Sequence, residues 1–170
     1  RMALCMIEGA EERGDLKPGG TIVDQSTGNT GPALAFVGAV KGYRVQLFLP
    51  AQLSSSYDPA DRIRIAELYG CNVAPIDLDE LVEDADKLQG VERAATFVAI
   101  RMKQCYDLQK RDPFHWWANQ LCNVDNTRAH REHTGREILE QMDGEIDGWV
   151  ASVGTGGTLL GVAQSLKEAN

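Results

Sequence analysis

Several features are scarce or missing in this 170-residue sequence, and their absence excludes whole classes of protein. No apolar run approaches the roughly 18 residues that a membrane-spanning helix needs, and no stretch of this sequence has the pattern of a secretory signal peptide. Acidic residues outnumber basic ones, 25 to 17, which gives a net charge of -8 and argues against nucleic acid or an anionic membrane as a partner. The composition favours a cytoplasmic protein.

Metal and disulfide patterns are also missing. The four cysteines, at positions 5, 71, 105 and 122, are widely spaced without a Cys-x-x-Cys, so the sequence predicts reduced thiols. His130 and His133 lie three residues apart, but no third ligand has a suitable spacing, and no metal site is predicted. Cys122 has no histidine partner at a recognised spacing, which disfavours a role as nucleophile.

A polar loop at residues 25–32 lies between a predicted strand and a predicted helix. Residues 21–23 have the pattern of a short buried strand, and the apolar residues 33–40 predict a helix that ends at Gly42. Pro32 suits the first turn of that helix. The loop therefore places backbone N–H groups and small polar side chains at a helix N-terminus, where α/β proteins bind anions.

A second loop of this kind occupies residues 154–158, Gly-Thr-Gly-Gly-Thr. It follows a predicted buried strand at residues 149–153 and precedes a predicted apolar helix at residues 159–166. No Lys-Ser/Thr pair follows the glycines, and Leu159 stands where the dinucleotide fingerprint has its third glycine. The glycines and hydroxyls therefore predict a phosphate cradle of another type.

Strands and helices alternate along the rest of the chain. This order implies parallel strands joined by right-handed crossovers. The acidic run over residues 77–86 is interpreted as a solvated helix face. The predicted helices cover residues 2–13, a segment capped by Asp58-Pro59 that ends at Gly70, a segment from Val91, and one capped by Asp125 or Asn126; the predicted strands cover residues 45–49, 72–76 and 114–118.

Both loops resemble those of a known enzyme family. Ser26-Thr27-Gly28-Asn29-Thr30-Gly31 resembles the substrate loop of the pyridoxal-phosphate enzymes of fold type II, the tryptophan synthase β-like group, and residues 154–158 resemble its phosphate loop. Residues 41–43 and 49–50 are most similar to the cysteine synthase and cystathionine β-synthase branch, and residues 119–126 and 130–138 agree. The resemblance implies a three-layer αβα fold with a Rossmann-like parallel sheet, and pyridoxal 5'-phosphate as cofactor.

The resemblance also implies that this chain is an internal segment of a longer enzyme. Arg1 resembles an arginine that stands two residues after the family's Schiff-base lysine, so that lysine is expected just before Arg1 and no catalytic residue is expected in the chain. The segment alone is expected to be inactive. Residues 1–23 are expected to begin a larger domain to which residues 113–170 contribute cofactor binding, and residues 24–112 to form a smaller mobile α/β domain.

Roles for individual residues follow from the resemblance. Hydrogen bonding of the cofactor's ring hydroxyl oxygen is implied for Asn29. For Asn29 and for each hydroxyl or amide side chain given a role in the next sentence, ordinary capping of the loop backbone is the alternative. The resemblance implies phosphate binding by Gly154, Thr155, Gly156, Gly157 and Thr158, and binding of the substrate α-carboxylate by Ser26, Thr27, Gly28, Thr30 and Gln120.

The reaction implied is β-replacement, in which a thiol or sulfide replaces the leaving group of an O-activated serine. We expect L-cysteine to be formed from O-acetylserine and sulfide by a homodimer. One alternative is a cystathionine β-synthase or another β-eliminating lyase or deaminase. Others are a non-catalytic homologue that binds pyridoxal phosphate or an amino acid, and an unrelated α/β domain that binds a phosphorylated metabolite.

Overall fold

The computed structural model describes residues 1–51 and 60–169, which belong to two compact units. Unit 1 combines Arg1–Arg13 with Gln120–Asn170, and unit 2 is Gly14–Asn119. Across the described ranges, no helix has both the length and the apolar character that a membrane crossing requires.

Unit 2 contains a parallel sheet whose strand order is β3-β2-β1-β4. All five residues of β1 are buried, because β1 has a strand on either side and helices on both faces. The predicted strands at 45–49, 72–76 and 114–118 are confirmed, and so is the parallel pairing. The strands are β1 (Thr21–Gln25), β2 (Arg44–Pro50), β3 (Asn72–Ile76) and β4 (His115–Trp117).

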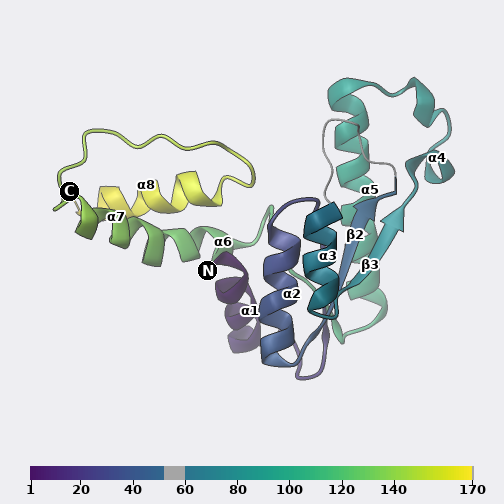
Figure 1. Ribbon diagram of the computed structural model, residues 1–170, viewed down its shortest axis with the longest axis horizontal. Coiled ribbons are helices and arrows are strands. Elements are labelled where there is room, and N and C mark those ends of the chain that lie inside the picture. Colours follow the sequence, from purple (N-terminus) through teal and green to yellow (C-terminus); the bar gives the residue numbers. More distant parts are fainter. Residues whose placement is uncertain (52–59, 170) are drawn as a thin grey trace. The chain divides into compact units, whose positions relative to one another are not determined.

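Helices cover both faces of this sheet, which confirms the three-layer αβα architecture. α2 (Thr30–Lys41) and α3 (Ala60–Leu68) pack on one face, and α5 (Gly90–Arg111) packs on the other (Figure 1). Val23 and Phe48 point toward α5, where they form a buried cluster with Cys105. On the opposite face Gly38 lets α2 approach β2, because a Cβ there would lie 2.5 Å from a methyl group of Val45.

Several local predictions for unit 2 can be compared with the structure. α2 ends as expected, at Gly42, whose φ of 81° is a left-handed conformation that glycine adopts without strain. The proposed cap at Asp58-Pro59 lies outside the described residues. The acidic run includes the short helices α4 (Leu78–Leu81) and η1 (Ala85–Lys87); Glu80, Glu83 and Asp84 are exposed, whereas Asp77 is half-buried.

The regular secondary structure of the described part of unit 1 is helical. α6 (Val124–Ala129), the π-helix η2 (His130–Thr134) and α7 (Gly135–Gln141) follow one another directly, and α8 (Gly157–Ala169) runs beside them in the same direction (Figure 1). The close packing depends on small residues. A Cβ at Gly161 would lie 2.4 Å from the carbonyl oxygen of Thr127, and one at Gly135 would lie 2.3 Å from the Cβ of Ser165.

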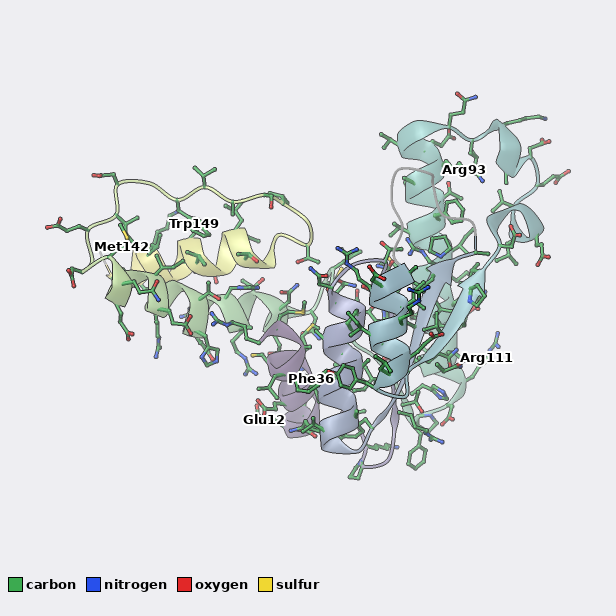
Figure 2. All side chains as sticks on the ribbon, in the orientation of Figure 1. Glu12, Phe36, Arg93, Arg111, Met142 and Trp149 are labelled. Atoms are coloured by element: carbon green, nitrogen blue, oxygen red, sulfur yellow. The ribbon has the colours of Figure 1, made fainter. Side chains whose placement is uncertain are left out.

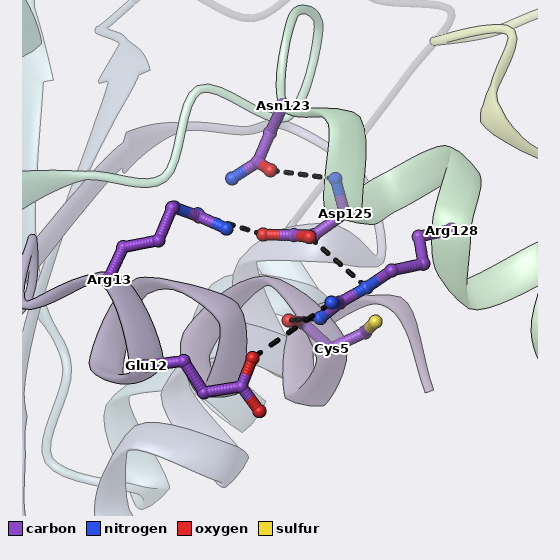
Figure 3. Close-up of polar contacts among 6 residues, drawn as sticks. All are labelled: Cys5, Glu12, Arg13, Asn123, Asp125 and Arg128. Carbon is purple, nitrogen blue, oxygen red and sulfur yellow. Dashed lines mark hydrogen bonds and ion pairs between the residues drawn. The ribbon is translucent and has the colours of Figure 1, made fainter.

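α1 (Met2–Arg13) packs against α6, as Figure 3 shows. Asp125 is almost fully buried and lies between two arginines, 2.9 Å from Nη2 of Arg13 and 3.2 Å from Nε of Arg128. Arg128 also donates to the carbonyl oxygen of Cys5 in α1. Paired charges of this kind tolerate burial, whereas removal of one partner leaves an uncompensated charge. Asp125 therefore fixes α1 against α6.

Two predictions for unit 1 are wrong. Residues 149–153 do not form a buried strand: Val150 is 92% exposed and Val153 68% exposed, because the described part of unit 1 offers no strand with which they could pair. Trp149 instead lies along α8, and its indole Nε1 donates to the carbonyl oxygen of Leu159 at 3.2 Å (Figure 2).

The predicted cap of α6 is displaced by two residues. Asn123 is the N-cap, and its Oδ1 accepts a hydrogen bond from the backbone N–H of Asp125 at 3.0 Å. Asp125 and Asn126 lie inside the helix because both side chains are buried and bonded elsewhere, to the arginines and to the loop at residues 154–158. An asparagine two positions earlier caps equally well, and sequence alone does not choose between them.

Candidate functional site

The loop at residues 26–30 of unit 2 connects β1 to α2. Ser26 is buried, and its Oγ accepts a hydrogen bond from the backbone N–H of Gly31 at 3.0 Å. Ser26 therefore satisfies one of the amide groups that a helix N-terminus leaves unpaired. Thr30 is the first residue of α2, and Gly28 has open space around the position of a Cβ. Thr27 and Gly28 line a small cavity that also reaches Arg62.

Asn29 occupies the N-cap position of α2, but its side chain makes no capping hydrogen bond. Its Oδ1 instead accepts from Nε of Arg62 in α3 at 2.9 Å. A guanidinium group can only donate, so this contact fixes which end of the amide faces Arg62. The Nδ2 group of Asn29 is then the end that can donate to a ligand.

The loop at residues 154–158 of unit 1 leads directly into α8. Gly156 has a φ of 85°, a left-handed conformation that favours glycine. A Cβ at Gly157 would lie 2.4 Å from Oδ1 of Asn126, so only glycine fits there without displacing a buried side chain. The backbone is therefore held close to α6 while its N–H groups lie at the start of a 13-residue helix.

Asn126 connects two of the predicted site segments. Its Nδ2 donates to the backbone carbonyl of Gln120 and to Oγ1 of Thr155, both at 2.9 Å. The backbone N–H of Gly157 also donates to Oγ1 of Thr155, at 3.3 Å. The structure therefore brings Gln120, which is itself buried, to the same side chain that holds the loop.

His130 contacts the last residue of this loop. Its Nε2 lies 3.2 Å from Oγ1 of Thr158, and its Nδ1 lies 3.0 Å from Oγ1 of Thr134. Burial lowers the pKa of His130 below its ordinary value of 6.5, and the nearby positive charge of Arg1 lowers it further. The imidazole is therefore predominantly neutral at pH 7.

The donor set of residues 154–158 fits a phosphate group. It combines two hydroxyls, glycine amides and the N-terminus of α8, all of which favour an anion. No aspartate or glutamate occurs between Gly148 and Lys167, so no carboxylate from this stretch would repel a dianion. Among the residues that the structure describes, no three histidine, cysteine, aspartate or glutamate side chains converge on a possible metal site.

The described cysteines are free thiols, as predicted. Burial raises the pKa of Cys71 to about 12, and burial likewise raises the pKa of Cys105 well above its usual range. Neither thiol is therefore a nucleophile at neutral pH.

The predicted site residues fall into two groups. Ser26 to Thr30 belong to unit 2, whereas Gln120 and residues 154–158 belong to unit 1. From the sequence, Asn126 was predicted only as a possible helix cap and His130 had no predicted role in the site, yet the side chains of both hold the second loop. A usable signal was present: polar residues 126, 130 and 134 recur every fourth position, which places them along one side of a helix.

Comparisons with known proteins agree with this geometry. The family model described as "Pyridoxal-phosphate dependent enzyme" matches residues 1–170. The chain is 34% identical to a cysteine synthase of Dictyostelium discoideum, covering 100% of this chain and 40% of the relative. It is 35% identical to the cystathionine beta-synthase of Mus musculus, covering 99% of this chain and 27% of the relative.

Solved structures give the same result. The cysteine synthase of Entamoeba histolytica superposes with a TM-score of 0.79 at 34% identity, over 99% of this chain and 44% of that chain. The chain thus spans less than half the length of each of these relatives. The matched fold, the glycine loop before α8 and the family model over all residues show that this chain belongs to the family of pyridoxal-phosphate dependent enzymes.

Proposed function

We propose that the natural protein containing this chain catalyses a pyridoxal-phosphate dependent β-replacement that forms L-cysteine from O-acetylserine and sulfide. The observation that carries the proposal is the loop at residues 154–158, whose hydroxyls are held by Asn126 and His130 at the start of α8. Similarity to cysteine synthases from two eukaryotes supports the choice of reaction.

The loop residues Gly154 to Thr158 are proposed to hold the cofactor phosphate. Hydrogen bonds to a charged phosphate are stronger than those between neutral groups, and the partial positive charge of the α8 N-terminus adds to them. When bound, pyridoxal phosphate supplies an electron sink for the α-carbon of an amino acid. The Nδ2 group of Asn29, on the amide whose Oδ1 accepts from Arg62, is proposed to donate to the ring hydroxyl oxygen.

The substrate carboxylate is proposed to be bound by Ser26, Thr27, Gly28, Thr30 and Gln120. Hydroxyl and amide donors suit a carboxylate, and the N-terminus of the 12-residue helix α2 favours its negative charge. Ser26 accepts from the backbone N–H of Gly31 and donates its hydroxyl hydrogen to the carbonyl oxygen of Gly28 at 3.5 Å, a long hydrogen bond that a charged carboxylate oxygen is proposed to replace.

The direct test uses the natural protein purified with pyridoxal phosphate. We expect visible absorption from protein-bound cofactor, a change of that spectrum when O-acetylserine is added, and its reversal with release of cysteine when sulfide follows. A protein that binds no pyridoxal phosphate would refute the proposal. A protein that binds the cofactor but whose spectrum does not respond to any amino acid would favour a non-catalytic binding protein.

Cystathionine synthesis is the second candidate, since the mouse cystathionine beta-synthase is as similar as the cysteine synthases. The same preparation distinguishes the two reactions if serine with homocysteine is compared with O-acetylserine with sulfide. The natural sequence before Arg1 supplies a further test: a lysine two positions upstream supports an enzyme, and any other residue there supports a binding protein. We also propose a cytoplasmic homodimer, which sedimentation and fractionation would test.

A further inference from the structure

A row of polar side chains on one side of the α6–η2 segment faces the loop at residues 154–158. Asn126, His130 and Thr134 are spaced four residues apart, and each makes a hydrogen bond with a side chain of the loop or of its neighbour in the row. Arg1 extends the row, because its Nη1 donates to Oγ1 of Thr134 at 3.0 Å. These contacts decide which way the loop hydroxyls point.

The direction of the Thr155 hydroxyl follows from counting its hydrogen and its lone pairs. A threonine hydroxyl has one hydrogen and two lone pairs. The oxygen of Thr155 accepts from Nδ2 of Asn126 and from the backbone N–H of Gly157, which occupies both lone pairs. The hydrogen of Thr155 is therefore left to donate, and a phosphate oxygen is a suitable acceptor.

The direction of the second hydroxyl depends on His130. Thr158 and Nε2 of His130 are 3.2 Å apart, and either atom can carry the hydrogen of this bond. If Nε2 carries a hydrogen, it donates to Thr158, whose own hydrogen is then available for a ligand. If Nδ1 carries the hydrogen instead, Thr158 donates to Nε2 and cannot donate to a phosphate.

Thr134 selects between these two tautomers. Arg1 can only donate, so the oxygen of Thr134 is an acceptor in that contact, and the hydrogen of Thr134 needs an acceptor of its own. The usual acceptor for a helical threonine hydroxyl is the carbonyl four residues earlier. The hydroxyl of Thr96 does this, donating to the carbonyl oxygen of Glu92 at 2.9 Å, whereas the described hydrogen bonds of the Thr134 hydroxyl are with Arg1 and His130 Nδ1, and none is with the carbonyl of His130. The remaining acceptor is Nδ1 of His130, 3.0 Å away, which leaves the imidazole hydrogen on Nε2.

We propose that His130 is a positioning residue: held in its Nε2–H tautomer by Thr134 and Arg1, it turns the hydroxyl of Thr158 into a donor for the phosphate of the bound cofactor. The inference rests on the proposed function only for the identity of that acceptor. The contact between His130 and Thr134 lies within a π-helix, and π-bulges are frequent at functional sites.

The tautomer can be measured without any reaction. In the natural protein labelled with ¹⁵N-histidine, the two ring nitrogens of His130 give different chemical shifts according to which carries hydrogen, and His130→Gln identifies the signals by their loss. We expect the Nε2–H pattern at pH 7.5. An Nδ1–H pattern would overturn the inference and leave the proposed function standing.

Affinity for pyridoxal phosphate relative to pyridoxal, which lacks the phosphate, tests the effect on the ligand. The amide of His130→Gln reaches the position of Nε2, whereas that of His130→Asn reaches the position of Nδ1. We expect the asparagine variant to lose about tenfold in affinity for pyridoxal phosphate, the value of one hydrogen bond to a charged group. The glutamine variant should retain most of that affinity, and both should bind pyridoxal like the natural protein.

Thr158→Val and Thr158→Ser complete the test as a double-mutant cycle. Once Thr158 is valine, His130→Asn should cause no further loss, whereas in the serine variant its effect should persist. Equal losses for the glutamine and asparagine variants, or equal losses of pyridoxal and pyridoxal phosphate, would show a merely structural role and overturn the inference. A natural protein with no affinity for pyridoxal phosphate would refute the proposed function itself.

Discussion

Two segments of this chain have the same sequence pattern of apolar residues, a glycine-containing polar loop and a helix, yet only one contains a strand. Residues 21–25 form β1, fully buried and paired with β2 and β4. Residues 149–153 remain unpaired, and Val150 and Val153 are exposed. A helix forms its backbone hydrogen bonds within itself, whereas a strand forms them with neighbouring strands. A strand pattern therefore predicts an ability to pair, and the presence of a partner decides the outcome.

The largest expected effect tests this difference directly. Ile22 is 0% exposed in β1, so Ile22→Ala should lower the free energy of unfolding by about 2–5 kcal/mol. Val150 is 92% exposed, and Val150→Ala should change it by no more than about 0.5 kcal/mol. Urea unfolding of both variants of the natural protein measures these two changes in the free energy of unfolding. If Val150→Ala were as costly as Ile22→Ala, residues 149–153 would be a buried strand there after all.

The next prediction compares the glycines of the two loops. Gly157→Ala should cost about 1–3 kcal/mol, because its Cβ would lie 2.4 Å from the buried Asn126 side chain. In the first loop, Gly31→Ala should cost less, since the nearest atom is the terminal methyl of Leu47, which can move. Gly154→Ala, with open space around it, is the control for thermal unfolding. A neutral Gly157→Ala would mean that the second loop is not held by α6.

A smaller effect is expected from the cap of α2. Ser26→Ala removes the acceptor for the Gly31 amide and should destabilise the protein by about 1 kcal/mol. Asn29→Ala is the matched control, since its side chain makes no capping bond and its contact with Arg62 is exposed. Urea midpoints should therefore fall further for Ser26→Ala. The opposite order would assign the cap to Asn29.

The smallest expected effect is on the pH dependence of stability, to which the second loop contributes through His130. The folded state lowers the pKa of His130, which contacts the second loop, so the unfolded chain takes up its proton first as the solution is acidified. The stability due to the neutral imidazole is present above the unfolded pKa of 6.5 and declines as pH falls through it toward the folded pKa. His130→Gln should make unfolding less dependent on pH between 7.5 and 5, whereas the exposed His133→Gln serves as control. An unchanged pH dependence in His130→Gln would show that His130 does not contribute to the pH dependence of stability.

The sequence predicted those features that depend on local chemistry. Gly42 marked the end of α2, the helix predicted over residues 2–13 coincides with α1, and the strand predicted over residues 72–76 coincides with β3. It did not predict features that depend on distant partners. Asp125 lies inside α6 because arginines from two helices surround it, whereas the capping rule ignores burial and does not distinguish Asp125 from Asn123.

In the candidate site too, the features that depend on local residue types were predicted and those that depend on packing were not. The residue types of the two loops indicated an anion and a phosphate, because glycine and hydroxyl content is visible in sequence. The supporting side chains were not identified, since Arg62, Asn126 and His130 meet the loops only through packing of α3, α6 and η2. The π-helix also alters the helical spacing after His130, a change that the sequence pattern does not predict.

The buried Asp125 has a consequence for how the protein is synthesised. Arg128 and Cys5, which it helps to join, are 123 residues apart, and the whole of unit 2 is made between the two parts of unit 1. At ribosomal speeds α1 waits roughly ten seconds for its partner helix. Unit 2 is continuous and can fold meanwhile, whereas Met6 and Ile7 stay without their final neighbours. The nascent chain is therefore expected to depend on chaperones at α1.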